Sequence, residues 1–235
     1  MHEALTYWRS HLPEYAAEII VVLVSVGLYI SIRLTENVTN GVVTGFDQSI
    51  LLMFRNPAQL SDPIGPDWLE LVVRDVSALG GLTVLSILVV VVSGFILLNG
   101  NRILALFVML AITGGSVMNM LLKGLIERPR PDIVPHGTAA ALSSFPSGHA
   151  MMSAIVYLTL GALLAVSSDT ARVKAYFLLW SILLTVLVGV SRIYLGVHWP
   201  TDVIAGWIMG SIWALICLFV SGFFLRPGAV ASVEQ

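Results

Sequence analysis

Polar and ionisable residues concentrate in three short segments of this chain, residues 123–131, 146–149 and 191–202. The first segment holds lysine and arginine, which bind phosphate oxygens as a point charge and as a two-pronged donor. The other two each carry a histidine, a side chain that can attack an electrophile or transfer a proton. Cations beside two histidines are the groups that phosphoryl transfer needs, because the cations stabilise charge on the phosphoryl oxygens.

The third segment places a carboxylate four residues after a histidine, at His198 and Asp202. Pro200 lies between them and suits the first turn of a helix. The carboxylate has two interpretations, which the spacing leaves open. It can hydrogen-bond one ring nitrogen of His198 and leave the other nitrogen free to react, or it can stabilise the amino end of the helix. Arg192 precedes the histidine by six residues.

The second segment reads Pro-Ser-Gly-His and stands just before an apolar run. Ser147 is a favoured helix N-cap residue, so we expect the backbone N–H groups of Gly148 and His149 to point outward from a helix end. Such an end attracts anions, because the helix dipole is positive there. By itself the tetrapeptide also fits a plain helix start without a ligand.

The first segment brings three cations, Lys123, Arg128 and Arg130, to the end of another apolar run. Prolines on both sides of Arg130 stiffen the backbone and end the helix. Lys123 and Arg130 can bind phosphate or can be basic residues at the membrane interface, and their position leaves both interpretations open. Arg128 is interpreted instead as a basic residue that snorkels at the membrane interface, with Glu127 as its ion-pair partner.

The composition of the chain indicates a membrane protein. It has 235 residues, of which 57% are hydrophobic and 11% charged, with a mean hydropathy of +0.91. Soluble domains carry about twice that charged fraction, and disorder needs low hydrophobicity. The net charge of −2, without a basic run, gives no support to nucleic-acid binding. Cys217 is the single cysteine, which rules out an internal disulfide and disfavours a cysteine-based metal site.

Six windows are long and apolar enough to be transmembrane helices. They are expected to be helical, since every backbone polar group inside a bilayer must be bonded within the chain. The predicted fold class is all-α: one integral-membrane domain over residues 1–235, with six transmembrane helices and interfacial amphipathic helices. The windows are Glu18–Ile32, Leu82–Leu98, Ile103–Leu122, Ala150–Val166, Ala175–Val190 and Val203–Leu225.

Six spans place both termini and the two short connectors on one side of the membrane, and the three polar segments on the other. The first side carries basic residues, which favours the cytoplasm under the positive-inside rule. We therefore expect the polar segments to face the periplasmic, extracytoplasmic side of a bacterial inner membrane. The basic residues are Arg9, Arg102, Arg172, Lys174 and Arg226.

The connector at residues 33–81 contains two apolar-periodic stretches, Phe46–Phe54 and residues 65–79. Their spacing predicts helices that lie in the membrane interface. The connector is either a packed cap without a function of its own or a lid over a lipid headgroup site. A second pattern, Gly206-x-x-x-Gly210, is typical of close helix packing. We expect that packing within the chain rather than in a dimer.

The three polar segments together resemble the tripartite signature of the type-2 phosphatidic acid phosphatase superfamily. That signature is a lysine followed after six residues by Arg-Pro, then Pro-Ser-Gly-His, then Ser-Arg followed after five residues by histidine and after three more by aspartate. It spans residues 123–202, about a third of the chain, and the six predicted spans extend the resemblance to most of it. The matching residues are Lys123, Arg130, Pro131, Pro146, Ser147, Gly148, His149, Ser191, Arg192, His198 and Asp202.

The resemblance implies a role for these residues. His198 would be the nucleophile that forms a phosphohistidine, Asp202 would orient and activate it, and His149 would protonate the leaving group. No cluster of Asp or Glu has the pattern of a magnesium or two-metal site, so we expect a reaction without a metal or another cofactor. The residues implied to bind the phosphoryl oxygens are Lys123, Arg130, Ser147, Gly148 and Arg192.

We therefore predict a metal-independent hydrolase for a membrane lipid phosphate or diphosphate, of the undecaprenyl diphosphate, phosphatidylglycerol phosphate or phosphatidic acid type. Its partners would be the lipid substrate and the bilayer, with no nucleic acid and no obligate protein partner. One alternative is a lipid phosphotransferase that uses the same phosphohistidine. A more distant alternative is a transporter or anion-binding protein, which commonly places its site near the membrane midplane.

Overall fold

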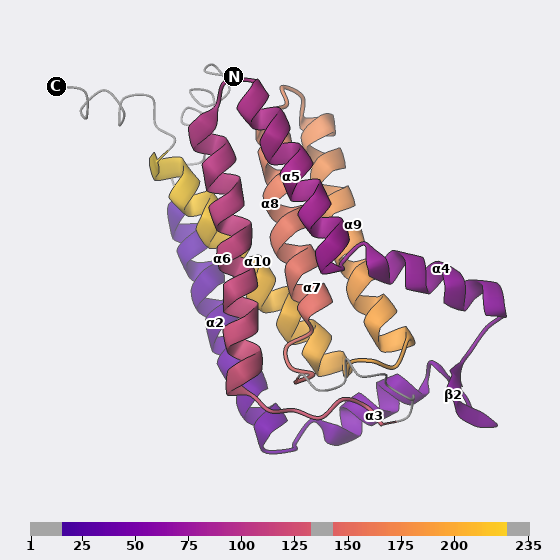
Figure 1. Ribbon diagram of the computed structural model, residues 1–235. Helices are drawn as coiled ribbons and strands as arrows, with labels where there is room; N and C mark the ends of the chain where they lie inside the picture. The colour runs from indigo at the N-terminus through magenta and orange to yellow at the C-terminus, as the bar shows by residue number, and fades with distance from the viewer. Residues whose placement is uncertain (1–15, 133–142, 225–235) are drawn as a thin grey trace.

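The computed structural model describes residues 16–132 and 143–224 and shows a bundle of long helices (Figure 1). Within these residues, five helices are long and apolar enough to cross a membrane, and the count is six if the bent pair Asp67–Ala78 and Leu82–Leu98 forms one span. The predicted all-α membrane fold is thus confirmed. The helices and strands are α2 (Ala16–Thr39), α3 (Thr44–Leu52), β1 (Arg55–Asn56), β2 (Gln59–Pro63), α4 (Asp67–Ala78), α5 (Leu82–Leu98), α6 (Arg102–Leu125), α7 (Gly148–Ser153), the π-helical turn η2 (Ala154–Leu158), α8 (Thr159–Val166), α9 (Ala171–Tyr194) and α10 (Pro200–Phe224).

The first span is longer than predicted. Helix α2 continues beyond Ile32 to Thr39, although this last part contains Arg33 and Glu36. The two side chains are exposed and form an ion pair of 2.8 Å along the helix. A pair spaced three residues apart is a favourable helical contact, so the charges do not end the helix.

The connector contains the two predicted helices, α3 and α4, and a hairpin that was not predicted. Strands β1 and β2 pair antiparallel, with Asn56 opposite Gln59. The side chain of Asn56 accepts a hydrogen bond of 3.0 Å from the Ala58 N–H, a local turn typical of asparagine. Such short strands carry too few residues for a periodic signal.

Helix α4 bends by 46° into α5 and extends sideways from the bundle (Figure 1). The break covers residues 79–81. The Tyr157 hydroxyl donates a hydrogen bond of 2.7 Å to the Leu79 carbonyl, which satisfies a backbone group freed by the break. The hydroxyl therefore ties the break to the fourth span.

The fourth span, α7–η2–α8, is the most buried of the candidate spans. Its Met151 and Ile155 side chains are fully enclosed in the main apolar core. Helix α10 packs against α2, α7, η2 and α9. Two tryptophans bond across the helices: Trp207 donates to the Thr185 carbonyl at 3.0 Å and Trp213 to the Ala111 carbonyl at 2.7 Å.

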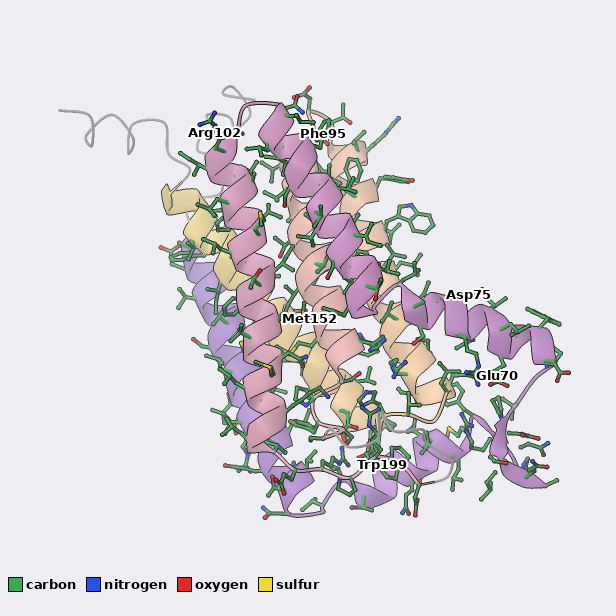
Figure 2. All side chains as sticks on the ribbon, in the orientation of Figure 1. Glu70, Asp75, Phe95, Arg102, Met152 and Trp199 are labelled. Carbon is green, nitrogen blue, oxygen red and sulfur yellow. The ribbon has the colours of Figure 1, made fainter. Side chains whose placement is uncertain are left out.

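The bundle has two ends and an apolar side. Figure 2 places Arg102 and Phe95 at one end and Trp199 at the other. Aliphatic side chains along α2 are exposed, Val22 by 58% and Leu23 by 50%. An exposed apolar face of this length suits contact with lipid tails.

Gly206 and Gly210 pack within the chain, as predicted. A Cβ atom built on Gly206 would lie 2.8 Å from the Ser147 carbonyl oxygen, and one on Gly210 would lie 2.5 Å from that of Met151. Both glycines therefore let α10 approach the backbone of α7 closely. This contact sets the distance between the second and third polar segments.

We predict that Gly206→Ala lowers both activity and stability, because the backbone of α7 must move away from α10. Overpacking of this kind costs about 1–3 kcal/mol. Gly94→Ala on α5 is the control, since its added Cβ meets nothing within 4 Å. The melting temperature in detergent, and the rate of the phosphate release that the resemblance predicts, should both fall for Gly206→Ala alone. Equal values for both variants would contradict the importance of this contact.

Candidate active site

The three polar segments lie on helix ends and come together at the end of the bundle where Figure 2 places Trp199. Lys123 ends α6, the Ser147–His149 segment begins α7, Arg192 lies in the last turn of α9, and Asp202 lies in the first turn of α10. Lys123 is close enough to Arg130, Arg192 and Asp202 to interact with their charges. His149 likewise interacts with His198, Lys123, Arg130 and Arg192.

His198 and Asp202 face each other. The Nδ1 atom of His198 lies 3.5 Å from Oδ2 of Asp202, which is beyond the usual length of a hydrogen bond, about 3.2 Å. The contact is therefore mainly electrostatic. The same Oδ2 accepts a hydrogen bond of 2.9 Å from the Trp199 N–H. The carboxylate therefore stabilises the start of α10, whereas it faces the imidazole of His198 without the expected hydrogen bond.

His198 is almost completely enclosed, with 2% of its surface exposed. Burial lowers its pKa to about 4, against the opposing effect of Asp202, because removal of water disfavours the charged imidazolium. His198 is neutral at neutral pH. Asp202 faces the Nδ1 side of the ring.

The loop that carries His198 begins with a helix stop at Gly196. This glycine has a φ of +70°, a conformation that side chains disfavour. The Val197 N–H bonds to the Arg192 carbonyl and the Gly196 N–H to the Ile193 carbonyl, at 3.2 and 2.9 Å. This pairing is the Schellman motif. It turns the chain back toward α10 and leaves the Val197 carbonyl to accept a hydrogen bond of 3.1 Å from Arg130.

Ser147 occupies the N-cap position of α7, as predicted, but its hydroxyl makes no capping hydrogen bond. Its backbone N–H donates instead to the Asp202 carbonyl at 2.9 Å. The buried hydroxyl has no hydrogen-bond partner among the described residues. A Cβ on Gly148 would lie 3.4 Å from Cε of Lys123, so glycine brings the backbone close to that lysine.

The three predicted phosphate-binding cations are each held by one neutral partner. Lys123 donates to the Ser143 carbonyl at 2.9 Å, and Arg192 donates to the Ser77 hydroxyl at 2.7 Å. In the described part of the chain, Nε of Arg130 and Nε of Arg192 are buried without a hydrogen-bond partner. Buried donors are normally satisfied. Unused donors on these cations suit an anionic ligand.

The structure contradicts the prediction for Arg128. Its side chain is only 12% exposed and forms ion pairs with Asp47 and Asp202, at 2.6 and 2.5 Å. It neither snorkels at the interface nor pairs with Glu127. Snorkelling is the expected behaviour of a lone basic residue at a helix end. The prediction is wrong here because the fold brings two carboxylates, from residues distant in the sequence, next to the Arg128 guanidinium.

Sequence reasoning also missed Asp47 and Ser77, which come from the connector. Asp47 is a fully buried carboxylate within the apolar stretch of α3. A charge inside an apolar stretch near a membrane is a signal of function that could have identified it. Ser77 carries no comparable signal, because its contact with Arg192 joins residues 115 positions apart.

The arrangement is suited to phosphoryl transfer by side chains. It combines the neutral imidazole of His198, which faces the Asp202 carboxylate, with the imidazole of His149 and three cations. Within residues 16–132 and 143–224, no group of three or more His, Cys, Asp or Glu residues is placed to hold a metal ion. The fold and the site therefore define a membrane-embedded phosphoryl-transfer protein.

Comparison with known proteins identifies its family. The PAP2 superfamily matches residues 102–224, and the chain belongs to that superfamily. Phosphatidylglycerophosphatase B of Bacillus subtilis is 33% identical over 157 residues, which cover 66% of this chain and 75% of the relative. The crystal structure of a transmembrane PAP2-type phosphatidylglycerolphosphate phosphatase from the same organism covers 87% of this chain and 98% of that one, with a TM-score of 0.74 and 27% identity.

Two shorter matches have the same general activity. The undecaprenyl-diphosphatase of Sulfolobus acidocaldarius is 37% identical over 92 residues, 39% of this chain and 38% of the relative. The lipid A 1-phosphatase of Rhizobium etli is 34% identical over 110 residues, 43% of each chain. The chain is a membrane-embedded lipid phosphatase of the PAP2 superfamily.

We predict that Ser77→Ala lowers kcat/KM by about tenfold, since a hydrogen bond to a charged group contributes about 1.5–3 kcal/mol and Arg192 loses the group that holds it. Ser93→Ala on α5 is a matched control: Ser93 is buried, and its hydroxyl has no partner among the described residues. Steady-state phosphate release from a lipid phosphate measures both. An unchanged kcat/KM in Ser77→Ala would show that Arg192 is held by other contacts.

Proposed function

We propose that this phosphatase hydrolyses a membrane lipid phosphate or diphosphate through a phosphohistidine on His198. The observation that carries the proposal is the position of this imidazole. Nδ1 of His198 faces Asp202 at 3.5 Å, and the charges of Arg130 and Arg192 act on the ring. A neutral nucleophile beside cations suits attack on a phosphate anion.

In the proposed first step, Nε2 of His198 forms a bond to phosphorus while the bond to the leaving oxygen breaks. His149 donates a proton to that oxygen. In the second step, water attacks phosphorus and gives a proton to His149, the N–P bond breaks, and inorganic phosphate leaves. Lys123, Arg130 and Arg192 hold the phosphoryl oxygens in both steps, together with the Ser147 hydroxyl and the Gly148 N–H. The positive charges of Lys123, Arg130 and Arg192 oppose protonation of His149. A bound phosphate anion offsets these charges, so His149 can carry the proton that it donates.

The proposed substrate is a lipid with a terminal phosphate. The site lies at one end of the transmembrane bundle, where a headgroup can reach the cations while the tails stay in the bilayer. Phosphatidylglycerol phosphate and undecaprenyl diphosphate are the candidates suggested by the names of the relatives. Arg102, Arg172 and Lys174 lie at the start of α6 and α9, the ends of those helices away from the site, which supports a periplasmic active site in a bacterial inner membrane.

The first test is phosphate release in detergent micelles with EDTA present, from the parent protein and from His198→Ala. We expect release by the parent and a loss of at least about 1,000-fold in the variant, as for removal of a nucleophile. Undecaprenyl diphosphate, phosphatidylglycerol phosphate and phosphatidic acid are compared as substrates. Activity retained by His198→Ala would contradict the phosphohistidine. Parent activity that EDTA abolishes would contradict a metal-independent reaction.

The alternative, a phosphotransferase, shares the first step and differs in the acceptor. The same assay separates the two when a second lipid is added and its phosphorylated product is measured beside free phosphate. Free phosphate as the main product supports the hydrolase.

The ionisation of His198 gives a separate prediction. Because burial lowers its pKa from 6.5 to about 4, the imidazole is deprotonated at pH 6 and gains a proton only as the pH falls toward 4. NMR of the ¹⁵N-histidine-labelled protein measures the protonation of His198 as the pH falls. The His198 signal is the one that is absent in His198→Asn. A midpoint close to that of an exposed histidine, about 6.5, would contradict a buried, neutral nucleophile.

A further inference from the structure

A buried chain of charges connects the connector helix α3 to His198. Asp47 on α3 is fully buried, and its Oδ2 lies 2.6 Å from Nη2 of Arg128. Nη1 of the same guanidinium lies 2.5 Å from Oδ1 of Asp202. Arg128 therefore bridges two carboxylates from elements far apart in the sequence, and the second of them faces His198.

Thr201 closes this network between the two carboxylates. Its N–H donates to Oδ1 of Asp47 at 2.9 Å, and its hydroxyl donates to Oδ2 at 2.7 Å. The hydroxyl oxygen accepts a hydrogen bond of 2.8 Å from Nη1 of Arg128. The guanidinium also lies over the Trp199 ring, 5.6 Å from its centroid, a favourable distance for a cation–π contact.

The bridge depends on the shape of arginine. The N–H donors of a guanidinium point outward along different edges of one rigid plane, so it can bond two carboxylates at once, whereas a lysine ammonium is a single point charge. Asp47 and Asp202 are both fully buried. A buried carboxylate without a counter-charge is costly, so each member of the network holds the others in place.

We propose that Asp47 and Arg128 are positioning residues that hold Asp202 against His198. Arg128 binds Oδ1 of Asp202, which leaves Oδ2 for the Trp199 N–H and the imidazole. This inference rests on the proposed function, in which His198 is the nucleophile. It makes α3 part of the catalytic machinery, neither an inert cap nor a lid that opens and closes.

The packing of α3 supports this role. Leu51, one turn after Asp47, is fully buried in a cluster with Ala150 of α7 and Val203 of α10. The helix is thus fixed by apolar contacts beside the two segments that carry His149 and Asp202. These contacts place Asp47 within 2.6 Å of Arg128.

The kinetic test uses the full chain in detergent with two substitutions of similar size, Asp47→Asn and Arg128→Lys. Each removes one side of the bridge, so we expect kcat to fall about 100-fold, the effect of a small misplacement of catalytic groups. KM should change less than about threefold, because neither side chain binds the substrate. Glu36→Gln is the control, since it removes a carboxylate from an exposed ion pair with Arg33. Parent-like kcat in both variants would overturn the inference.

A second readout separates positioning from a general loss of structure. The charged or titratable groups that act on His198 include Asp202, Arg192, Arg130 and His149. Asp202 raises the pKa of His198. Arg128→Gln and Asp47→Asn both release Asp202 from its position, so each should move the NMR titration midpoint of His198 to lower pH. A fall in kcat with an unmoved midpoint would reduce the network to a structural role and overturn the inference.

A double variant, Asp47→Asn with Arg128→Lys, completes the cycle. If the two residues act through one network, the combined fall in kcat is smaller than the product of the separate falls. Fully multiplicative losses would contradict a shared network. The outcome is distinct from failure of the proposed function, which would appear as activity in His198→Ala whatever these variants do.

Discussion

The site depends on the buried carboxylate of Asp202. Each of its oxygens has a different partner: Oδ1 lies 2.5 Å from Arg128, and Oδ2 accepts the Trp199 N–H at 2.9 Å while it faces His198. Its carbonyl accepts the Ser147 N–H. A charge buried this deeply requires such partners. As a result, the second and third polar segments and the connector are fixed relative to one another through one residue.

The surrounding fold provides rigid helix ends for these contacts. Helix α10 approaches α7 closely at Gly206 and Gly210, so the first turns of the two helices lie side by side. The stop at Gly196 returns the chain from α9 to α10 and carries His198 between Arg192 and Asp202. His149 and Asp202 lie in the first turns of α7 and α10, and helices hold side chains more precisely than loops do, whereas His198 lies on the short loop between α9 and α10. The site therefore needs little regular structure beyond the bundle itself.

The cations are arranged differently from the carboxylates. Lys123, Arg130 and Arg192 each donate to a neutral oxygen of the protein, whereas Arg128 is paired with two carboxylates. Like charges held close together without counter-ions are unfavourable, and a bound phosphate anion relieves that repulsion. In the proposed mechanism, the neutralised arginine holds Asp202 in position, and the other three cations bind the phosphoryl group of the substrate. This division explains how four basic residues at one end of the bundle can have two different functions.

The sequence alone determined the membrane class, the six spans and the residues of the three polar segments. These depend on local properties: runs of apolar residues, helix-start signals and the spacing of a motif such as His198 to Asp202. Only the tertiary structure decided the roles of Arg128, Asp47 and Ser77. Arg128 has the sequence pattern of an interfacial cation, but α3 places Asp47 next to it, although the two residues are 81 positions apart in the sequence. Ser77 has no sequence signal of its own, and the packing of α4 against α9 brings it to 2.7 Å from Arg192. Contacts between distant residues are set by packing, for which a single sequence carries no local signal.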